Sequence, residues 1–412
     1  MEAIRLRVNE TNTGHIRAAM IGTLCLGGLS GLMATGLLGP FRDDFAGQYQ
    51  LSQGQLGTAI AVIGIVLGII GIWQGPKLAD RIGRYRLLKC SVGMMVIGLV
   101  GCGLVGHGQR KDLPGLVAFW GLFMLGAYLS IIVNAVVTDL WRDRPRRGVM
   151  LLHSVLSIGK IIGPVIAWFC MILLDTSGWR GFFFFGAATS LTILVFLSFV
   201  PQGKVYHPRE THSWEEAPVE RPFAMWLAAA LLGLMAGGET ALATIAPLFF
   251  AKQHLLSTKL AATLLAFHFA AVAGGRFAFG LFGGKLSSRT IVALGFLPAA
   301  LMIPAAYSAY KGVSVVCFVL AGFSFSATWP CVFTHVASVF SQNRSRLALA
   351  VGLSNAAGIA LGTFATSQIF ETNRPLSLAF GPAALVFSAA MFILLQKTFS
   401  GAGHPRESSP AE

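Results

Sequence analysis

Long apolar runs alternate with short polar segments along almost the whole chain. Each run is close to the 20 or so residues that an α-helix needs to cross the hydrocarbon core of a bilayer. The pattern therefore predicts an all-α polytopic membrane protein with twelve transmembrane helices. The predicted spans are residues 16–41, 56–75, 89–107, 114–138, 149–172, 179–200, 223–250, 260–282, 291–309, 312–338, 347–370 and 377–397.

The longest polar segment, residues 201–222, separates six predicted spans from the other six. We interpret it as a cytoplasmic linker between an N-terminal six-helix half (1–200) and a C-terminal six-helix half (223–397), with a cytoplasmic tail at 398–412. The halves also repeat a pattern: Arg147 precedes Gly159-x-x-x-Gly163, and 199 residues later Arg346 precedes Gly358-x-x-x-Gly362. Two pseudo-symmetric halves are typical of secondary transporters, which rock around a central site.

Composition and charge agree with a membrane location. Hydrophobic residues make up 55% of the chain and charged residues 12%, about half the charged fraction of soluble proteins. The predicted loops and termini of one side hold 21 Lys and Arg, and those of the other side hold 8. Positive charge collects on the cytoplasmic side, so both termini are expected to be cytoplasmic, in a bacterial inner membrane. The net charge of +14 is thereby explained without a nucleic-acid partner.

The segment after the second span carries a specific motif. Residues 75–84 read Gly-Pro-Lys-Leu-Ala-Asp-Arg-Ile-Gly-Arg, which resembles the signature loop of the major facilitator superfamily. The resemblance implies a transporter, monomeric as is usual in that family, in which this loop is a conformational latch. Asp80 would cap a neighbouring helix N-terminus and favour its dipole, and Arg84 would reach Asp139. The predicted latch residues are Gly75, Asp80, Arg81, Gly83, Arg84 and Asp139.

A second resemblance is to the fucose-permease-like branch of the superfamily, whose members import sugars with protons. It rests on Leu152-His153, Gly238-Glu239, Gly275-Arg276 and Trp329-Pro330. The chain departs from that branch in having no acidic residue in the centre of its first span, Asn134 in the fourth span and Lys160 in the fifth.

Ionisable residues at mid-span depth are the candidate site. A charge at the bilayer centre costs at least about 2.5–3.5 kcal/mol on insertion scales, and such residues usually face a cavity or pair with one another. Glu239, Lys160 and His268 lie near the middle of spans 7, 5 and 8, and Arg276 lies two turns further along span 8. Glu239 and His268 are the predicted proton-coupling residues. The predicted substrate-binding residues are Lys160, Asn134, Tyr128, Arg276, Trp329 and Asn355.

Simpler structural roles stay open for several of these residues. Glu239 would form a buried ion pair with Lys160 or Arg276 that only fixes helix packing. His268 would be hydrogen-bonded to a neighbour, and Trp329 would face lipid.

The leading hypothesis is a secondary active transporter that moves a small polar organic solute by alternating access, through proton-coupled symport. Two cations against one anion at mid-depth favour an organic anion, whereas the amides and the branch resemblance favour a sugar. A drug or metabolite exporter using proton antiport and a non-transporting membrane scaffold are the alternatives. The sequence contains no nucleotide-binding or hydrolase motif, and its six cysteines lack metal-ligand spacing. We therefore expect no enzyme activity, metal or cofactor, and a proton gradient as the energy source.

Overall fold

The computed structural model describes residues 2–37, 39–105, 112–141, 145–174, 178–199, 219, 221–282, 293, 296–326, 328–340 and 343–400. Within this part of the chain the regular structure is helical. Eleven helical segments are long and apolar enough to cross a membrane, and a twelfth, shorter apolar helix lies within the predicted ninth span. The prediction of an all-α bundle of twelve spans in two halves is confirmed.

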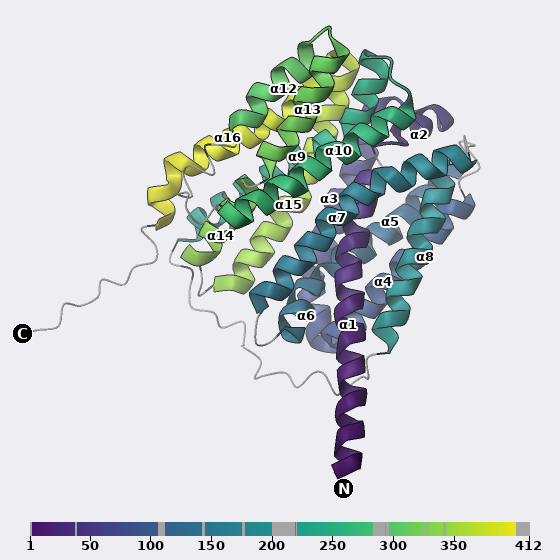
Figure 1. The fold of residues 1–412 in the computed structure, drawn as a ribbon, viewed down its shortest axis with the longest axis vertical. Helices are drawn as coiled ribbons and strands as arrows, with labels where there is room; N and C mark the ends of the chain where they lie inside the picture. The colour runs from purple at the N-terminus through teal and green to yellow at the C-terminus, as the bar shows by residue number, and fades with distance from the viewer. Residues whose placement is uncertain are drawn as a thin grey trace, which may run out of the picture.

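The first half contains six of the predicted spans and one short connecting helix, α2 (Figure 1). Its helices are α1 (Glu2–Gly36), α2 (Arg42–Gln48), α3 (Gln53–Ile82), α4 (Arg84–Val105), α5 (Leu113–Leu129), η2 (Ser130–Ile132), α6 (Val133–Leu140), α7 (Pro145–Leu174) and α8 (Gly178–Ser198). The predicted fourth span is one path built from α5, the 3₁₀ turn η2 and α6.

The second half occupies the upper left of Figure 1, from α9 in teal to α16 in yellow. Its helices are α9 (Pro222–Gln253), α10 (Thr258–Phe282), α12 (Leu297–Tyr307), α13 (Lys311–Phe325), α14 (Thr328–Val339), α15 (Arg344–Thr372) and α16 (Arg374–Ser400). The tenth span divides into α13 and α14 just before Pro330. A proline ring clashes with the carbonyl four residues earlier, here that of Ser326. The break between α13 and α14 therefore lies where Pro330 disrupts the helix.

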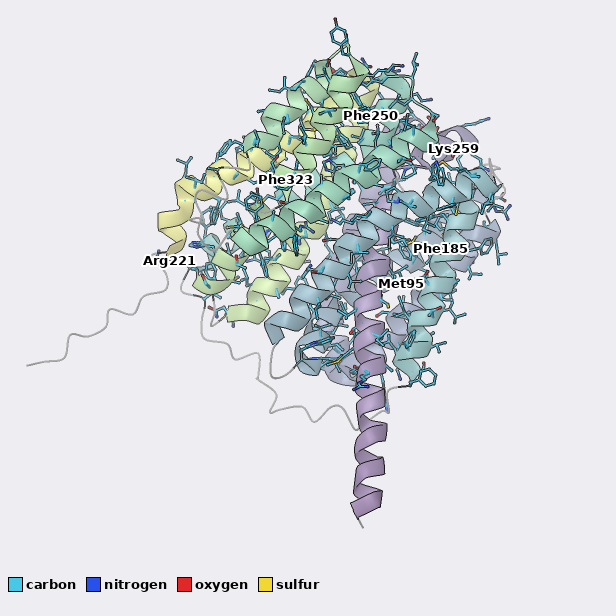
Figure 2. The ribbon with its side chains drawn as sticks, in the orientation of Figure 1. Met95, Phe185, Arg221, Phe250, Lys259 and Phe323 are labelled. Atoms are coloured by element: carbon cyan, nitrogen blue, oxygen red, sulfur yellow. The ribbon has the colours of Figure 1, made fainter. Side chains whose placement is uncertain are left out.

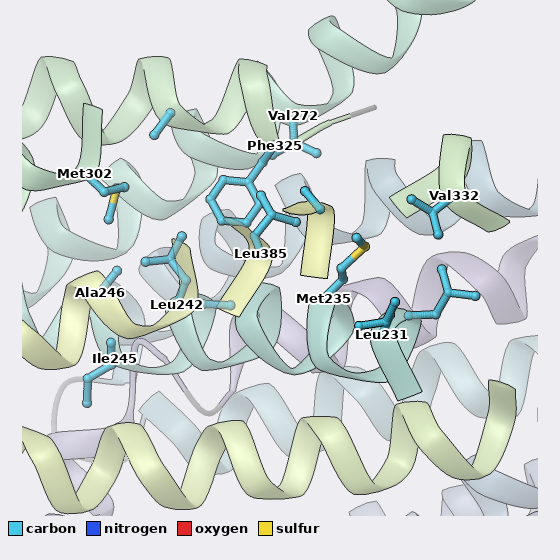
Figure 3. Close-up of a cluster of buried hydrophobic side chains, with 14 of the residues drawn as sticks. Leu231, Met235, Leu242, Ile245, Ala246, Val272, Met302, Phe325, Val332 and Leu385 are labelled. Carbon is cyan, nitrogen blue, oxygen red and sulfur yellow. The ribbon is translucent and has the colours of Figure 1, made fainter. Parts of the chain in front are cut away.

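Each half has its own hydrophobic core. One cluster of buried side chains draws almost entirely on residues 26–197, and the other draws on residues 224–392. Figure 3 shows part of the second cluster, where Met235 and Leu242 of α9 lie beside Phe325 and Leu385. The boundaries of the halves stay a prediction, because most of the linker (201–222) and most of the tail (398–412) lie outside the described residues.

The outside of the bundle is apolar as well. Phe277 on α10 is 71% exposed and Leu173 on α7 is 76% exposed. Phe185 and Phe323, labelled in Figure 2, also lie partly exposed on α8 and α13. Lipid tails are as apolar as these side chains, so such a surface suits a bilayer.

Glycines set the closest helix contacts, in corresponding places of the two halves. A Cβ atom on Gly159 of α7 would lie 2.0 Å from the carbonyl oxygen of Gly28 in α1. A Cβ atom on Gly358 of α15 would lie 1.9 Å from the carbonyl oxygen of Gly233 in α9. The first and fifth spans of each half therefore touch backbone to backbone, because glycine at these positions lets the helices approach closely.

Candidate functional site

An ion pair joins the two halves in the middle of the bundle. Lys160 Nζ of α7 lies 2.5 Å from Glu239 Oε1 of α9, and each side chain is 19% exposed. Both helices are held close to their neighbours by small residues, and Thr35 Oγ1 of α1 donates a hydrogen bond to the backbone oxygen of Lys160 at 2.9 Å. The pair is thus placed by the same glycine-rich contact that packs α1 against α7.

Arg276 of α10 adds a second cation to the pair. Its NH2 group lies 3.9 Å from Glu239 Oε2, its NH1 group donates to Ser157 Oγ of α7 at 2.6 Å, and its Nε atom donates to the backbone oxygen of Ser326 at 3.4 Å. Arg276 therefore also bridges the halves. One carboxylate lies between two cations, which leaves the cluster with a formal charge of +1.

A small cavity opens beside this cluster. Its walls come from α1, α7, α9 and α10, and it is lined by Ala34, Thr35, Lys160, Glu239, Thr240, Ala243 and Phe269. The Lys160 ammonium also lies 5.4 Å from the centre of the Phe269 ring, a cation–π arrangement. The space lies between the halves, where transporters of this architecture bind their solute.

His268 is turned toward the second half rather than into this cavity. Its ring is buried, its Nδ1 atom lies 2.9 Å from the backbone oxygen of Phe318, and it stacks on the Phe318 ring at 4.5 Å. These contacts tie α10 to α13, as expected of a structural histidine. Proton coupling by His268 stays a prediction, and its position along the span did not reveal the direction of its ring.

Trp329 does not face lipid alone. Its indole Nε1 donates a hydrogen bond to the backbone oxygen of Leu232 at 3.2 Å, and its ring stacks on Phe333 at 5.1 Å. The side chain therefore fastens α14, the shorter part of the divided tenth span, to α9.

Replacing Trp329 with phenylalanine is expected to lower the free energy of unfolding by about 1 kcal/mol. The change keeps an aromatic ring against Phe333 but removes the indole N–H, and a net hydrogen bond is worth about 0.5–1.5 kcal/mol. Thermal unfolding of the two proteins in the same detergent measures the difference. No loss of stability in Trp329→Phe would show that the bond to Leu232 contributes nothing.

The three remaining predicted substrate residues come from α5, α6 and α15. The ring of Tyr128 packs on α3 against Gly68, and its Cβ atom lies beside Gly71. Asn134 is exposed, and its amide donates to the backbone oxygen of Ile131 at 3.3 Å. Asn355 Oδ1 on α15 is buried and has no hydrogen-bond partner among the described residues. A buried acceptor of this kind favours a donor from a solute or water.

The predicted latch residues lie at the junction of α3 and α4. Gly83, which ends α3, has a φ of +88°, a conformation that favours glycine, and α4 begins at the next residue. Asp80 and Arg81 are exposed in the last turn of α3, whereas Gly75 is buried. The side chain of Asp139 lies outside the described residues, so its predicted contact with Arg84 stays a prediction.

The sequence reasoning missed two polar contributors to the cluster. Ser157 lies three residues before Lys160 on α7 and so shares its face, which was a usable signal. Thr35 gave none, because its contact with Lys160 arises only when α1 and α7 pack together.

Comparison with known proteins agrees on the architecture. A sequence model described as the Major Facilitator Superfamily matches residues 24–366. The chain is 28% identical over 200 residues to myo-inositol transporter 2 of Schizosaccharomyces pombe, covering 45% of this chain and 33% of that protein. It is 30% identical over 125 residues to a probable triacylglyceride transporter of Mycobacterium bovis, covering 30% of this chain and 23% of that protein. The matches thus span a third or less of these relatives.

Solved structures resemble the whole bundle. A D-xylose–proton symporter superposes with a TM-score of 0.74 at 16% identity, covering 92% of this chain and 97% of that one. A bacterial homologue of the human lysosomal transporter Spinster, in an inward-facing and unoccupied conformation, superposes with a TM-score of 0.72 at 18% identity, covering 96% and 99%. At such identities the likeness concerns the fold.

Proposed function

The chain belongs to the major facilitator superfamily and is a multi-pass membrane transporter, and we propose that it carries a small organic anion by proton-coupled symport. The observation that supports this most directly is the cluster of Lys160, Glu239 and Arg276 between the halves. Two cations and one anion leave a site that a second negative charge would complete. We further propose that the protein works as a monomer in a bacterial inner membrane, with both termini cytoplasmic.

In the proposed cycle, Glu239 pairs with the two cations while no solute is bound. In the structure its carboxylate lies beside both cations, 2.5 Å from Lys160 and 3.9 Å from Arg276. A carboxylate of the solute that binds those cations displaces Glu239 from them toward the apolar part of the cavity wall, which Ala34, Ala243 and Phe269 form. A carboxylate that loses its countercharges in such surroundings takes up a proton, because desolvation disfavours its charged form. Binding of the anion and uptake of a proton are thereby linked.

A neutral polyol or sugar is the second candidate solute. Asn355 Oδ1, for which the described part of the chain supplies no hydrogen-bond partner, suits a hydroxyl donor, and one relative is named as an inositol transporter. The Lys160–Glu239 pair would then act in coupling alone, and the solute would not compete with Glu239.

A thermal-shift screen of the purified protein separates these solutes. We expect small carboxylates to raise the unfolding temperature of the wild type by a few degrees, since a ligand at a hundred times its Kd adds roughly 2.7 kcal/mol. The shift should vanish in Lys160→Ala and persist in Lys259→Ala, whose lysine is exposed at the start of α10 (Figure 2).

The alternatives give different patterns in the same screen. Stabilisation of all three proteins by a polyol, with none by carboxylates, would replace the anion proposal with the sugar one. The absence of any effect from either class would favour a drug exporter or a scaffold.

A further inference from the structure

Polar contacts also join the halves at a second place, the end of the bundle opposite the start of α1. There α2 and the first turn of α3, from the first half, meet the last turns of α9 and α15 from the second, through the contacts Asp43–Lys252 and Gly54–Glu371. We call this region the distal end, and the charge distribution of the loops predicts that it faces away from the cytoplasm.

The carboxylate of Glu371 binds the start of a helix that belongs to the other half. The backbone N–H of Gly54 donates to Glu371 Oε1 at 2.7 Å, and α3 begins at Gln53. The first N–H groups of a helix have no partner within the helix, and a negative charge there is stabilised by the helix dipole. Ser52 and Gln55 form a capping box on the same turn, so Glu371 is an additional cap supplied from 317 residues away.

Arg42 makes a second contact across the halves beside it. Its NH2 group donates to Ser367 Oγ of α15 at 2.6 Å, and its Nε atom donates to Gln53 Oε1 at 2.8 Å. The side chain is 1% exposed, and among the described residues no carboxylate pairs with it. Ser367 of the second half covers one side of the guanidinium, so this group is buried only while the two halves meet here.

Small residues bring the helices close enough for these bonds. A Cβ atom on Gly57 would lie 2.1 Å from Ser367 Oγ, and Gln368 Nε2 donates to the backbone oxygen of Gly54 at 3.1 Å. The nearby pair of Asp43 and Lys252, 2.5 Å apart, is more than 40% exposed on both sides, and exposed pairs contribute little.

We propose that Glu371 and the first turn of α3 form a distal latch, which must break before the solute pathway opens on that side. It would act at the opposite end of α3 from the predicted latch at Gly75–Arg84, so each end of one helix would hold one closed conformation. The inference rests on alternating access, which is part of the proposed function, but it does not depend on which solute is carried.

The test measures the distance between spin labels on the two halves at the distal end. In a full-length protein whose six cysteines are replaced, labels at Gly47 on α2 and at Tyr310 before α13 report opening, and both sites are exposed. Replacing Glu371 with glutamine should raise the ratio of the population at the open distance to that at the closed distance about two- to fivefold, because Glu371 is exposed and an exposed charge at a helix start is only modestly stabilising. Glu371→Ala should shift it at least as much.

Three control variants make either result interpretable. Gly57→Val wedges the interface and should show the open distance, which proves that the labels detect it. Asp43→Asn removes an exposed pair and should change the ratio less than twofold, and Asp80→Asn, at the other latch, should not increase distal opening. An open distance in Gly57→Val together with an unchanged ratio in both Glu371 variants would overturn the latch. No solute is present, so the latch and the anion proposal fail independently.

Discussion

Neutralising both members of the Lys160–Glu239 pair is expected to recover the thermal stability that either single change loses. Lys160→Met leaves Glu239 largely buried, and among the described residues Arg276 at 3.9 Å is the cation that remains beside it. Removing one partner of a buried pair costs about 3–5 kcal/mol, and we expect roughly the lower value because both side chains are 19% exposed. The double variant Lys160→Met/Glu239→Gln removes both charges of the pair, while Arg276 keeps its hydrogen bonds to Ser157 and Ser326, and it should unfold closer to the wild type than either single variant.

The same double variant is expected to transport at less than a hundredth of the wild-type rate. It keeps the volume of the pair but cannot exchange a carboxylate for the solute or take up a proton. The measurement is solute-driven proton uptake into proteoliposomes, with a carboxylate found in the thermal-shift screen. Asp43→Asn/Lys252→Met is the matched control for stability, since that pair is exposed and its loss should cost less than about 1 kcal/mol.

The two measurements together separate coupling from packing. A pair that only fixed the helices would leave a stable double variant that transports normally, and this outcome would contradict the proposed role of Glu239. A double variant no more stable than Lys160→Met would instead show that the pair is not coupled energetically in the folded protein.

The sequence predicts much of this fold because lipid imposes a simple rule. An apolar run of about 20 residues must satisfy its backbone internally, so the spans follow from the pattern alone. The repeated glycines predict that the fifth and eleventh spans each have a close-packing face, whereas the partner helices are known only from the structure. The meeting of Glu239 with Lys160 and Arg276 was also foreseeable, because buried charges require partners.

The contacts that the sequence does not predict depend on how each helix is rotated about its own axis. Depth along a span placed His268 beside Glu239, but its ring bonds to Phe318. Glu371 reads as the polar end of the eleventh span, and only the packed halves bring it to Gly54. Contacts of this kind join residues 50 and 317 positions apart, and no local pattern encodes them.

A methyl group added at Gly358 is expected to prevent stable folding of the second half. The Cβ atom of Gly358→Ala would lie 1.9 Å from the carbonyl oxygen of Gly233 and 2.5 Å from its carbonyl carbon. These are backbone atoms, which cannot rotate away as a side chain would. Overpacking costs typically 1–3 kcal/mol, and we expect at least the upper value, because α15 must separate from α9 along its length. Thermal unfolding and the yield of monodisperse protein in detergent measure the loss.

Gly93→Ala provides the matched control for this prediction. Gly93 lies inside α4, and a Cβ atom there would meet nothing within 4 Å. Alanine favours a helix over glycine by up to about 1 kcal/mol, so this variant should be as stable as the wild type or more so. Equal stability of Gly358→Ala and Gly93→Ala would show that α9 and α15 do not touch at their backbones. Gly159→Ala, whose Cβ atom would lie 2.0 Å from the Gly28 oxygen, should behave like Gly358→Ala, because the two halves pack their first and fifth spans in the same way.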